Sequence, residues 1–321
     1  MLGRPREAMT ERTVEAAIDL GSNSVHVVVA EVADHRLRPL LDESVFLGLG
    51  AAVDARAHLG QAARAELAAV LGSYAERSRA LRASSVTLLG TEPLRRAADG
   101  ARIVDEVERS TGVPLLVLSH EEEAYLTMVG VTSGWPVENE TLVVDIGGGS
   151  SEFCAVAPVG SPRASGLRIG SNRLTTRYVA NDPPTRAELE AMRAASDEIL
   201  RGAPRSQPAD LAIVGGTATN LLKVTAAGAT DPVVTRGRVA EALETLVAAP
   251  AASIAERFAI NPRRAPLLAA GAVIVDALMR RYEIDRIRAS EASLREGALL
   301  AVDHAGRAWR DRLPELAHGW P

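Results

Sequence analysis

Two short stretches of the chain end an apolar run in the same way, and this repetition constrains the fold more than any other feature. Residues 18–24 read IDLGSNS and residues 144–150 read VDIGGGS, so each stretch contains Asp-x-Gly-x-x-Ser. Apolar residues resume after each turn, which predicts a strand, a tight glycine turn and a second, antiparallel strand. Asp19 and Asp145 are 126 residues apart, a spacing that predicts two related α/β domains with a boundary near residue 138.

The rest of the chain mixes the two periodicities. Helical spacing of apolar residues predicts helices at 61–81, 101–112, 120–134 and 185–200, and the chain reads as mostly helical from residue 238 onward. Short apolar runs predict strands at 16–21, 24–32, 36–47, 85–90, 114–119, 141–147, 151–158 and 211–216. Residues 159–184 read as polar and irregular. The fold class is therefore α/β.

Composition narrows the class of protein. The chain has 321 residues and a net charge of −5, which argues against a general nucleic-acid or membrane-surface binder. No apolar run reaches the roughly 18 residues that a membrane helix needs, and residues 1–13 read as a flexible lead-in. The single cysteine, Cys154, cannot form an internal disulfide, so we expect a reducing, cytoplasmic location. The Cys154 side chain reads as a small buried apolar group.

Two common nucleotide-binding designs do not fit this sequence. Lys223 is the only lysine and does not follow a glycine loop, which excludes a Walker-type loop. A dinucleotide-binding glycine turn opens a helix, whereas the first glycine turn here leads into a strand, which excludes that design as well.

The repeated turns have the residue types of a phosphate site. Consecutive backbone N–H groups in a tight turn form a concave arc that binds phosphate oxygens, and glycine allows a close approach. The predicted phosphate-binding residues are Gly21, Ser22, Asn23 and Ser24 in the first turn, and Gly147, Gly148, Gly149 and Ser150 in the second. Two such turns facing each other across a cleft would grip a phosphate chain from both sides.

The acidic residues beside these turns predict a metal. A carboxylate next to a phosphate is repulsive unless a cation lies between them, so Asp19, Asp145 and Glu152 are candidates to hold Mg²⁺ or another divalent cation. Glu152 also reads as an ordinary exposed residue of the second strand.

Several motifs together resemble the exopolyphosphatase/guanosine pentaphosphate phosphatase family. They are IDLGSNSVH, LLGTEPLRRAAD, SHEEEAYL, LVVDIGGGSSEF, SGLRIGSNRL, AIVGGTATN and SLREGALL, in order from about residue 15 to residue 302. The resemblance implies two RNase H-like domains of the actin-like ATPase superfamily with an interdomain cleft. It places the first domain at 1–138 and the second at 139–298, in the short two-domain form. The C-terminal helix, about 299–321, is expected to pack back on the first domain.

The resemblance also assigns roles. A glutamate of the Glu-Glu-Ala segment orients and deprotonates water in this family, which implies Glu123, with Glu122 as the second candidate because three acids in a row leave the register open. Without the resemblance, this run reads as an acidic first helical turn favoured by the helix dipole.

The expected phosphate contacts outside the two turns come from four further segments. Arg95 matches the family's arginine after the Gly-Thr turn, although Glu92 and Pro93 depart from the small residues common there, and Arg96 reads equally as surface or site. Arg168 matches an Arg-x-Gly position, whereas Arg173 and Arg177 read as ordinary helix-face residues. His26 reads as a buried structural residue. A further phosphate loop is expected at Gly215, Gly216 and Thr217.

Three functions stay open on the sequence. The first is an exopolyphosphatase acting on inorganic polyphosphate, and the second is a pppGpp 5′-phosphatase using the same residues. The third is an actin-like ATPase or kinase, or a noncatalytic nucleotide-binding sensor; the acidic segment argues against the sensor, and no sugar-binding signature supports the kinase. A homodimer is left open by the sequence.

Overall fold

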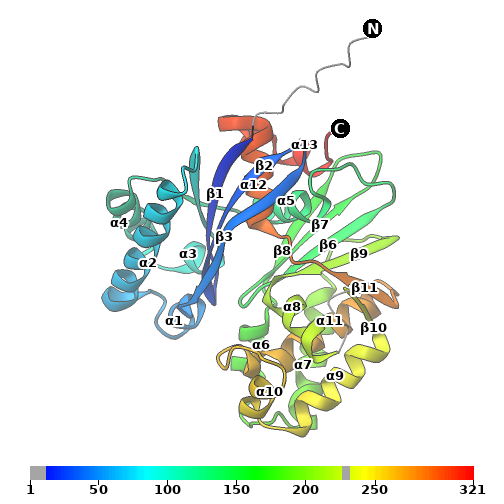
Figure 1. The fold of residues 1–321 in the computed structure, drawn as a ribbon. Helices are drawn as coiled ribbons and strands as arrows, with labels where there is room; N and C mark the ends of the chain where they lie inside the picture. The colour runs from blue at the N-terminus through cyan, green and yellow to red at the C-terminus, as the bar shows by residue number, and fades with distance from the viewer. Residues whose placement is uncertain (1–11, 226–231) are drawn as a thin grey trace.

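The computed structural model describes residues 12–225 and 232–321, which form two sheets flanked by helices (Figure 1). Most of the expected lead-in, residues 1–11, lies outside the described residues. Within the described ranges, no helix combines the length and the apolar character that a membrane crossing would require.

The first sheet has the strand order β3-β2-β1-β4-β5. β1 pairs antiparallel with β2, which pairs antiparallel with β3, whereas β4 and β5 continue in parallel on the other side of β1. Its strands are β1 (Thr13–Leu20), β2 (Ser24–Ala33), β3 (Arg36–Phe46), β4 (Ser85–Gly90) and β5 (Leu115–Val117). One face carries the helices α1 (Leu49–Arg56), α2 (Gly60–Ala80), α3 (Glu92–Arg96) and α4 (Gly100–Thr111).

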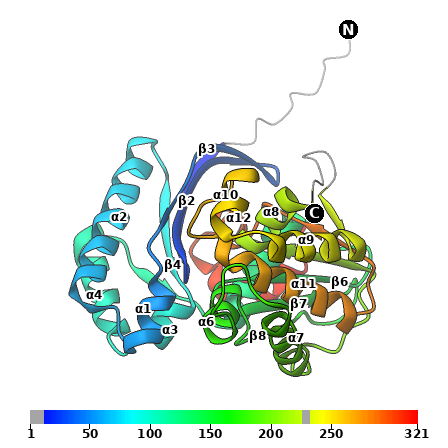
Figure 2. The ribbon, with the colours of Figure 1, turned by 90° about the horizontal axis from the view of Figure 1, so that it is seen from below.

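The second sheet repeats this order as β8-β7-β6-β9-β11, with β10 added at the edge. Its strands are β6 (Thr141–Ile146), β7 (Ser151–Val156), β8 (Arg163–Leu167), β9 (Asp210–Val214), β10 (Val233–Thr235) and β11 (Arg286–Ala289). The helices on its outer face are α6 (Ser171–Tyr178), α7 (Arg186–Leu200), α8 (Gly215–Val224), α9 (Arg236–Ala248), α10 (Ala251–Arg257) and α11 (Leu268–Arg281), as Figure 2 shows from below. The repeated topology confirms the expected α/β class.

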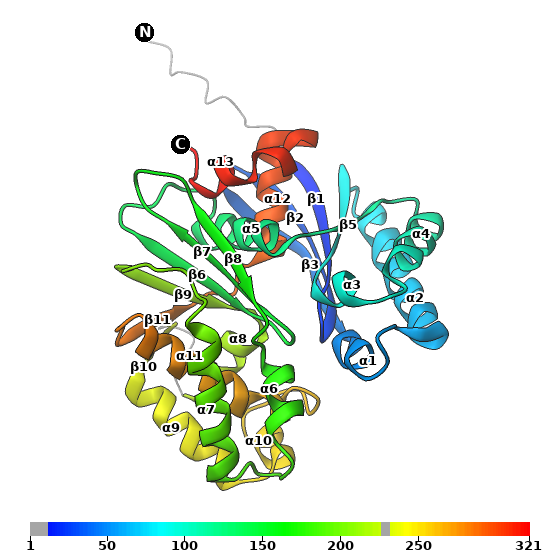
Figure 3. The same cartoon turned by 180° about the vertical axis from the view of Figure 1, so that it is seen from behind.

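Two helices fill the space between the sheets, so the molecule has five layers (Figure 3). α5 (His120–Thr132) packs on β7 and β8, and α12 (Leu294–Ala305) packs on β1 and β2. The helices cross at Gly130 and Gly297, where a Cβ atom on Gly297 would come within 1.8 Å of the Leu126 carbonyl oxygen. Two short 3-10 turns and α13 (Leu313–Ala317) then return the chain to α5.

The observed elements differ from the sequence expectation in several places. The C-terminal helix expected at about 299–321 is not continuous, because α12 ends at Ala305 before Gly306, which has φ +56°, and two 3-10 turns and α13 follow. The stretch expected to be irregular contains β8 and α6, the residues shortly before 238 form the short strand β10, and the region expected to be mostly helical from residue 238 contains the short strand β11. These strands have three to five residues, too few for alternation to stand out from the sequence. The segment after Thr91, expected to be a turn, forms the short helix α3.

Candidate active site

The two glycine bends have the same internal geometry. The Gly21 N–H donates to the Ser24 carbonyl oxygen at 3.0 Å, and the Gly147 N–H donates to the Ser150 carbonyl oxygen at the same distance. Each bond closes the tight turn between two antiparallel strands, β1 and β2 in the lobe built on the first sheet and β6 and β7 in the lobe built on the second. The sequence repeat therefore corresponds to a structural repeat.

The backbone carbonyl groups of each bend accept hydrogen bonds from the start of a helix in the same half of the molecule. Gly48 and Gly50 N–H groups donate to the carbonyls of Asn23 and Ser22 at 2.8 Å, near the start of α1. In the other lobe, the Ser171 and Arg173 N–H groups of α6 donate to Gly147 and Gly148 at 3.0 Å.

This arrangement leaves backbone donors available. Among the described residues, the N–H groups of Ser22, Asn23, Gly148 and Gly149 have no hydrogen-bond acceptor. An arc of unpaired N–H groups in a glycine turn is a site for anionic oxygens.

Both bends line one cavity of about 410 Å³. They approach each other closely, because a Cβ atom on Gly148 would come within 2.8 Å of the Asn23 side chain from the other lobe. Asp19 and Asp145 line the same cavity, at the ends of β1 and β6. The two aspartates therefore face a shared space and do not lie on opposite exteriors.

Burial raises the pKa of both aspartates. It raises the pKa of Asp19 to about 7, with the nearby Arg295 opposing the shift. Burial, followed by the Glu152 and Asp19 carboxylates, raises the pKa of Asp145 to about 8. The Asp19 Oδ1 atom is buried without a hydrogen-bond partner among the described residues. Crowded carboxylate oxygens with an unpaired buried atom fit a divalent cation, which prefers oxygen ligands.

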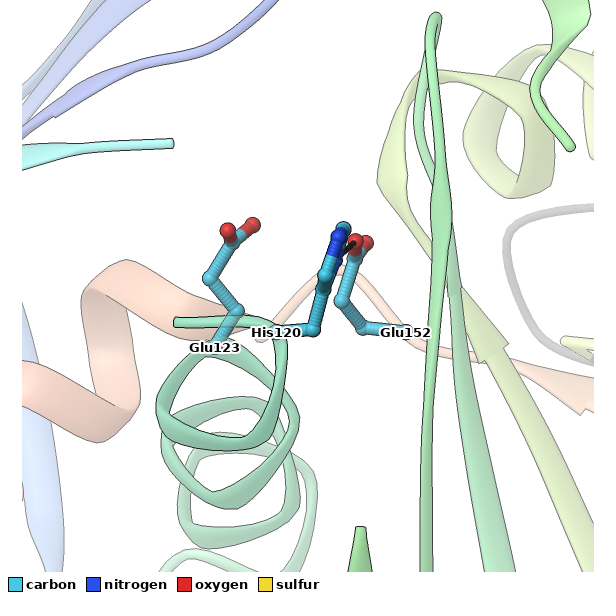
Figure 4. Close-up of side chains that lie close together, drawn as sticks. All are labelled: His120, Glu123 and Glu152. Carbon is cyan, nitrogen blue, oxygen red and sulfur yellow. Dashed lines mark hydrogen bonds and ion pairs between the residues drawn. The ribbon is translucent and has the colours of Figure 1, made fainter. Parts of the chain in front are cut away.

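A second acidic cluster lies beside the first. His120, Glu123 and Glu152 offer ligand atoms within 4.8 Å of one another, and Figure 4 shows them extending from α5 and β7 with their polar ends on the same side. The His120 Nδ1 atom lies 2.8 Å from Glu152 Oε1. Arg95 already supplies a positive charge here, because its guanidinium pairs with Glu123 and lies 2.9 Å from His120 Nδ1. The all-oxygen aspartate pair fits Mg²⁺ better than this cluster does.

Only one of the two candidate base residues lines the cavity. Glu123 is 6% exposed and lines it, and burial together with the Glu152 carboxylate raises the pKa of Glu123 well above its ordinary value. Glu122 completes the N-terminal capping box of α5 with Ser119, and its carboxylate pairs with Arg310. These bonds direct Glu122 away from the cavity lining.

The expected arginines occupy different surroundings. Arg95, expected to bind phosphate, does not line the cavity; it pairs with Glu123 and donates to the Leu118 carbonyl oxygen at 2.7 Å. Arg168 is exposed and does not line the cavity. Arg173, expected to be an ordinary helix-face residue, instead donates to the Gly149 carbonyl oxygen at 2.8 Å and to Glu92 at 2.9 Å. Arg177 lies over the Tyr178 ring.

The third loop also reaches the cavity. Gly215, Gly216 and Thr217 begin α8 and line the cavity wall. Gly215 has φ +89°, and a Cβ atom there would come within 2.8 Å of Asp145 Oδ1, so glycine allows this close approach.

Sequence reasoning missed a basic group at the cavity wall. Arg264 donates to Ser24 Oγ at 2.9 Å and lies 3.4 Å from His26, while Arg295 lies 3.3 Å from the other His26 ring nitrogen. His26 was expected to be a buried structural residue, but it is only partly buried and lines the cavity. Burial and the two guanidinium groups lower its pKa to about 3, so the imidazole is neutral at neutral pH. No local motif marks Arg264.

Comparison with known structures agrees with the observed topology. A Ppx/GppA family member from Aquifex aeolicus superposes with a TM-score of 0.81 at 26% identity, covering 92% of this chain and 99% of that one. An exopolyphosphatase from Cytophaga hutchinsonii, at 22% identity, shares the fold with a TM-score of 0.79 and covers 91% of this chain and 97% of its own. The two-lobed architecture defines a protein of the actin-like ATPase fold.

The sequence comparisons name the family. The chain belongs to the Ppx/GppA phosphatase family, whose sequence model matches residues 27–304. Exopolyphosphatase 1 of Mycobacterium leprae is 28% identical over 297 residues, covering 88% of this chain and 87% of that protein. A putative exopolyphosphatase of Haemophilus influenzae is 26% identical over 295 residues, covering 90% and 91%.

Proposed function

We propose that this protein is an exopolyphosphatase, which removes the terminal phosphate of inorganic polyphosphate by in-line attack of water. The observation that carries the proposal is the pair of facing glycine bends that share a cavity with the buried Glu123. The names of the M. leprae and H. influenzae relatives support the same activity. The chain's lone cysteine is fully buried and unpaired, which supports a cytoplasmic location.

The cavity lining favours a bare phosphate chain over a nucleotide. Among the described residues it contains no Phe, Tyr or Trp that could stack on a guanine base. It does contain Arg264 and Arg295, whose charges would attract phosphates beyond the two bends. A pppGpp phosphatase would use the same residues, and the substrate panel below distinguishes it from an exopolyphosphatase.

The chain's own groups divide the chemistry among them. The unpaired N–H groups of the two bends would bind phosphate oxygens of the chain and hold the phosphorus in line with the attacking water. Glu123 would accept a proton from that water, since a raised pKa makes an ionised carboxylate a stronger base. Arg95 would keep Glu123 oriented through their ion pair.

We assign the divalent cation to Asp19 and Asp145, with the neighbouring Glu152 as a further candidate ligand. When bound, the cation would neutralise negative charge on the phosphate chain and on these carboxylates. The raised pKa values of both aspartates fit this assignment, because they reflect burial of carboxylates beside like charges.

A substrate panel tests the proposal. Phosphate release is measured from short and long polyphosphate, pppGpp and ATP while Mg²⁺ is titrated. We expect polyphosphate to be the preferred substrate and its hydrolysis to require the cation. Preference for pppGpp over every polyphosphate length would replace the proposal with the nucleotide phosphatase, and inertness of all substrates would favour a noncatalytic sensor.

The role of Glu123 has its own test. Glu123→Gln keeps the side-chain shape but removes the base, so we expect turnover to fall by roughly 10²–10⁴-fold while binding of the phosphate chain is retained. Glu121→Gln is the matched control, because Glu121 is exposed in the same helical turn. Loss of binding with the chemistry intact would show that Glu123 holds the substrate instead.

A further inference from the structure

A third carboxylate lies between the two glycine bends. Glu92, the first residue of α3, is 4% exposed and lines the cavity. Its Oε2 atom accepts a hydrogen bond from Ser22 Oγ at 3.0 Å. Its Oε1 atom accepts hydrogen bonds from Arg96 at 2.7 Å and from Arg173 at 2.9 Å. The donors therefore come from both lobes, since Ser22 and Arg96 belong to the first and Arg173 to the second.

The glycine bend of the second lobe completes this environment. A Cβ atom on Gly149 would come within 2.5 Å of Glu92 Oε2, so the carboxylate lies directly against the bend. Two guanidinium groups, a hydroxyl and a glycine turn are the groups that proteins use to bind a phosphate group. Here an internal carboxylate occupies that position.

We propose that Glu92 fills an anion subsite that takes one phosphate group of the substrate chain when the Glu92 side chain withdraws. The inference deepens the proposed function, because it assumes a substrate that carries a row of phosphates. The oxygens of a phosphate that enters between Ser22, Arg96 and Arg173 would take the place of the Glu92 carboxylate oxygens. Each of these donors would therefore keep a hydrogen-bond acceptor.

The neighbouring Asp54 explains how the arginines stay in place during the exchange. It pairs with Arg96, lies 3.9 Å from Arg173 and does not line the cavity. With Asp54 present, the two guanidinium groups keep one carboxylate partner after Glu92 moves. The subsite would then carry a net positive charge that a phosphate can neutralise.

A different role for Glu92 predicts the opposite effect of its removal. If Glu92 serves only as a strut between the lobes through Arg173, its removal loosens their contact and weakens anion binding. If it occupies a phosphate subsite, its removal vacates the subsite and strengthens anion binding. The sign of the change therefore decides between the two roles.

The test measures binding of inorganic orthophosphate to the full chain by calorimetry in the presence of Mg²⁺. We expect Glu92→Ser to bind one more phosphate per chain than the wild type and to bind phosphate at least tenfold more tightly overall. Glu92→Gln, which removes the charge but fills the space, should give a smaller gain. Asp54→Asn is the matched control, since it removes a carboxylate from the same arginines without vacating the subsite, and we expect a change of less than twofold.

Three results would overturn the inference. They are unchanged or weaker phosphate binding in Glu92→Ser, an equal gain in Asp54→Asn, and an unchanged stoichiometry. Thermal unfolding checks that each variant folds, and if Glu92→Ser does not, the sign of the change in Glu92→Gln decides.

Orthophosphate binding needs no turnover, so the two proposals fail separately. Inert substrates with a gain in Glu92→Ser would remove the proposed hydrolase and keep the subsite. Active hydrolysis without that gain would keep the hydrolase and remove the subsite.

Discussion

Equivalent positions in the two hairpins carry different partners. Asp19 lies opposite His26 in the β1–β2 ladder, and Asp145 lies opposite Glu152 in the β6–β7 ladder. A neutral imidazole beside a carboxylate costs little, whereas two carboxylates facing each other repel. The second hairpin is therefore the stronger attractor for a cation, and in keeping with this the Glu152 carboxylate adds to burial in raising the pKa of Asp145.

Replacing Asp145 tests this reasoning at the level of one residue. Asp145→Asn preserves the shape but removes a charge that the cation would neutralise, so we expect the Mg²⁺ concentration for half-maximal activity to rise by about tenfold or more. Phosphate release is measured across a Mg²⁺ titration. Asp210→Asn, an exposed aspartate at the start of β9, is the control. An unaltered Mg²⁺ response in Asp145→Asn would place the cation elsewhere.

At the scale of the element, capping bonds determine where the helices near the site begin. Ser119 and Glu122 form a capping box at the start of α5, and this fixes which glutamate of the acidic run faces the cavity. Thr185 and Glu188 form the same box at the start of α7. Glu188 also accepts a hydrogen bond from the Ala180 N–H group, and this bond and the one from the Thr185 N–H group lower its pKa to about 2.

The α7 cap predicts a pH-dependent contribution to stability. Because the pKa of Glu188 is lower in the folded chain, its stabilising effect is present above the ordinary value of 4.5 and is lost as the pH falls towards about 2. Glu188→Gln should therefore lower the free energy of unfolding at pH 7, and its difference from the wild type should shrink in acid. Urea denaturation at several pH values measures this difference.

A control on the same helix separates the cap from surface charge. Glu190→Gln removes an exposed carboxylate that pairs only with Arg193 among the described residues, and we expect little change at any pH. A Glu188→Gln effect of equal size at pH 3 and pH 7 would contradict the cap mechanism.

At the scale of the whole molecule, the α5–α12 crossing joins the two lobes. α5 carries Glu123 and packs on the second sheet, while α12 carries Arg295 and packs on the first. Gly130 and Gly297 allow backbone-to-backbone contact at the crossing. A side chain there would separate the helices and shift both residues relative to the glycine bends.

Gly297→Ala tests the importance of this contact. We expect a loss of about 1–3 kcal/mol in the free energy of unfolding from overpacking, together with reduced phosphate release. Chemical denaturation and the activity assay measure the two effects. Gly72→Ala in α2 has open space around the added methyl group, so we expect it to stabilise the chain by about 0.5–1 kcal/mol. A neutral Gly297→Ala would show that the helices can separate without cost.

Much of the fold and part of the site could be predicted because their signals are local. The strand–glycine bend–strand units, the long helices and the α/β class follow from spacing within a few residues, as do the two aspartates. The short strands β8 and β11 could not be predicted, because their sequences, RASGL and RIRA, contain no run of apolar residues, and β10 has only three residues.

By itself, the sequence determined that the chain builds two similar glycine bends, each preceded by an aspartate, because bend and strand depend on neighbouring residues. Only the tertiary structure decided which side chains meet across the cavity. Arg173 reaches Glu92 from 81 residues away, and Arg264 reaches Ser24 from 240 residues away. Such contacts depend on how two lobes and a middle helical layer pack, and no short-range pattern carries that information.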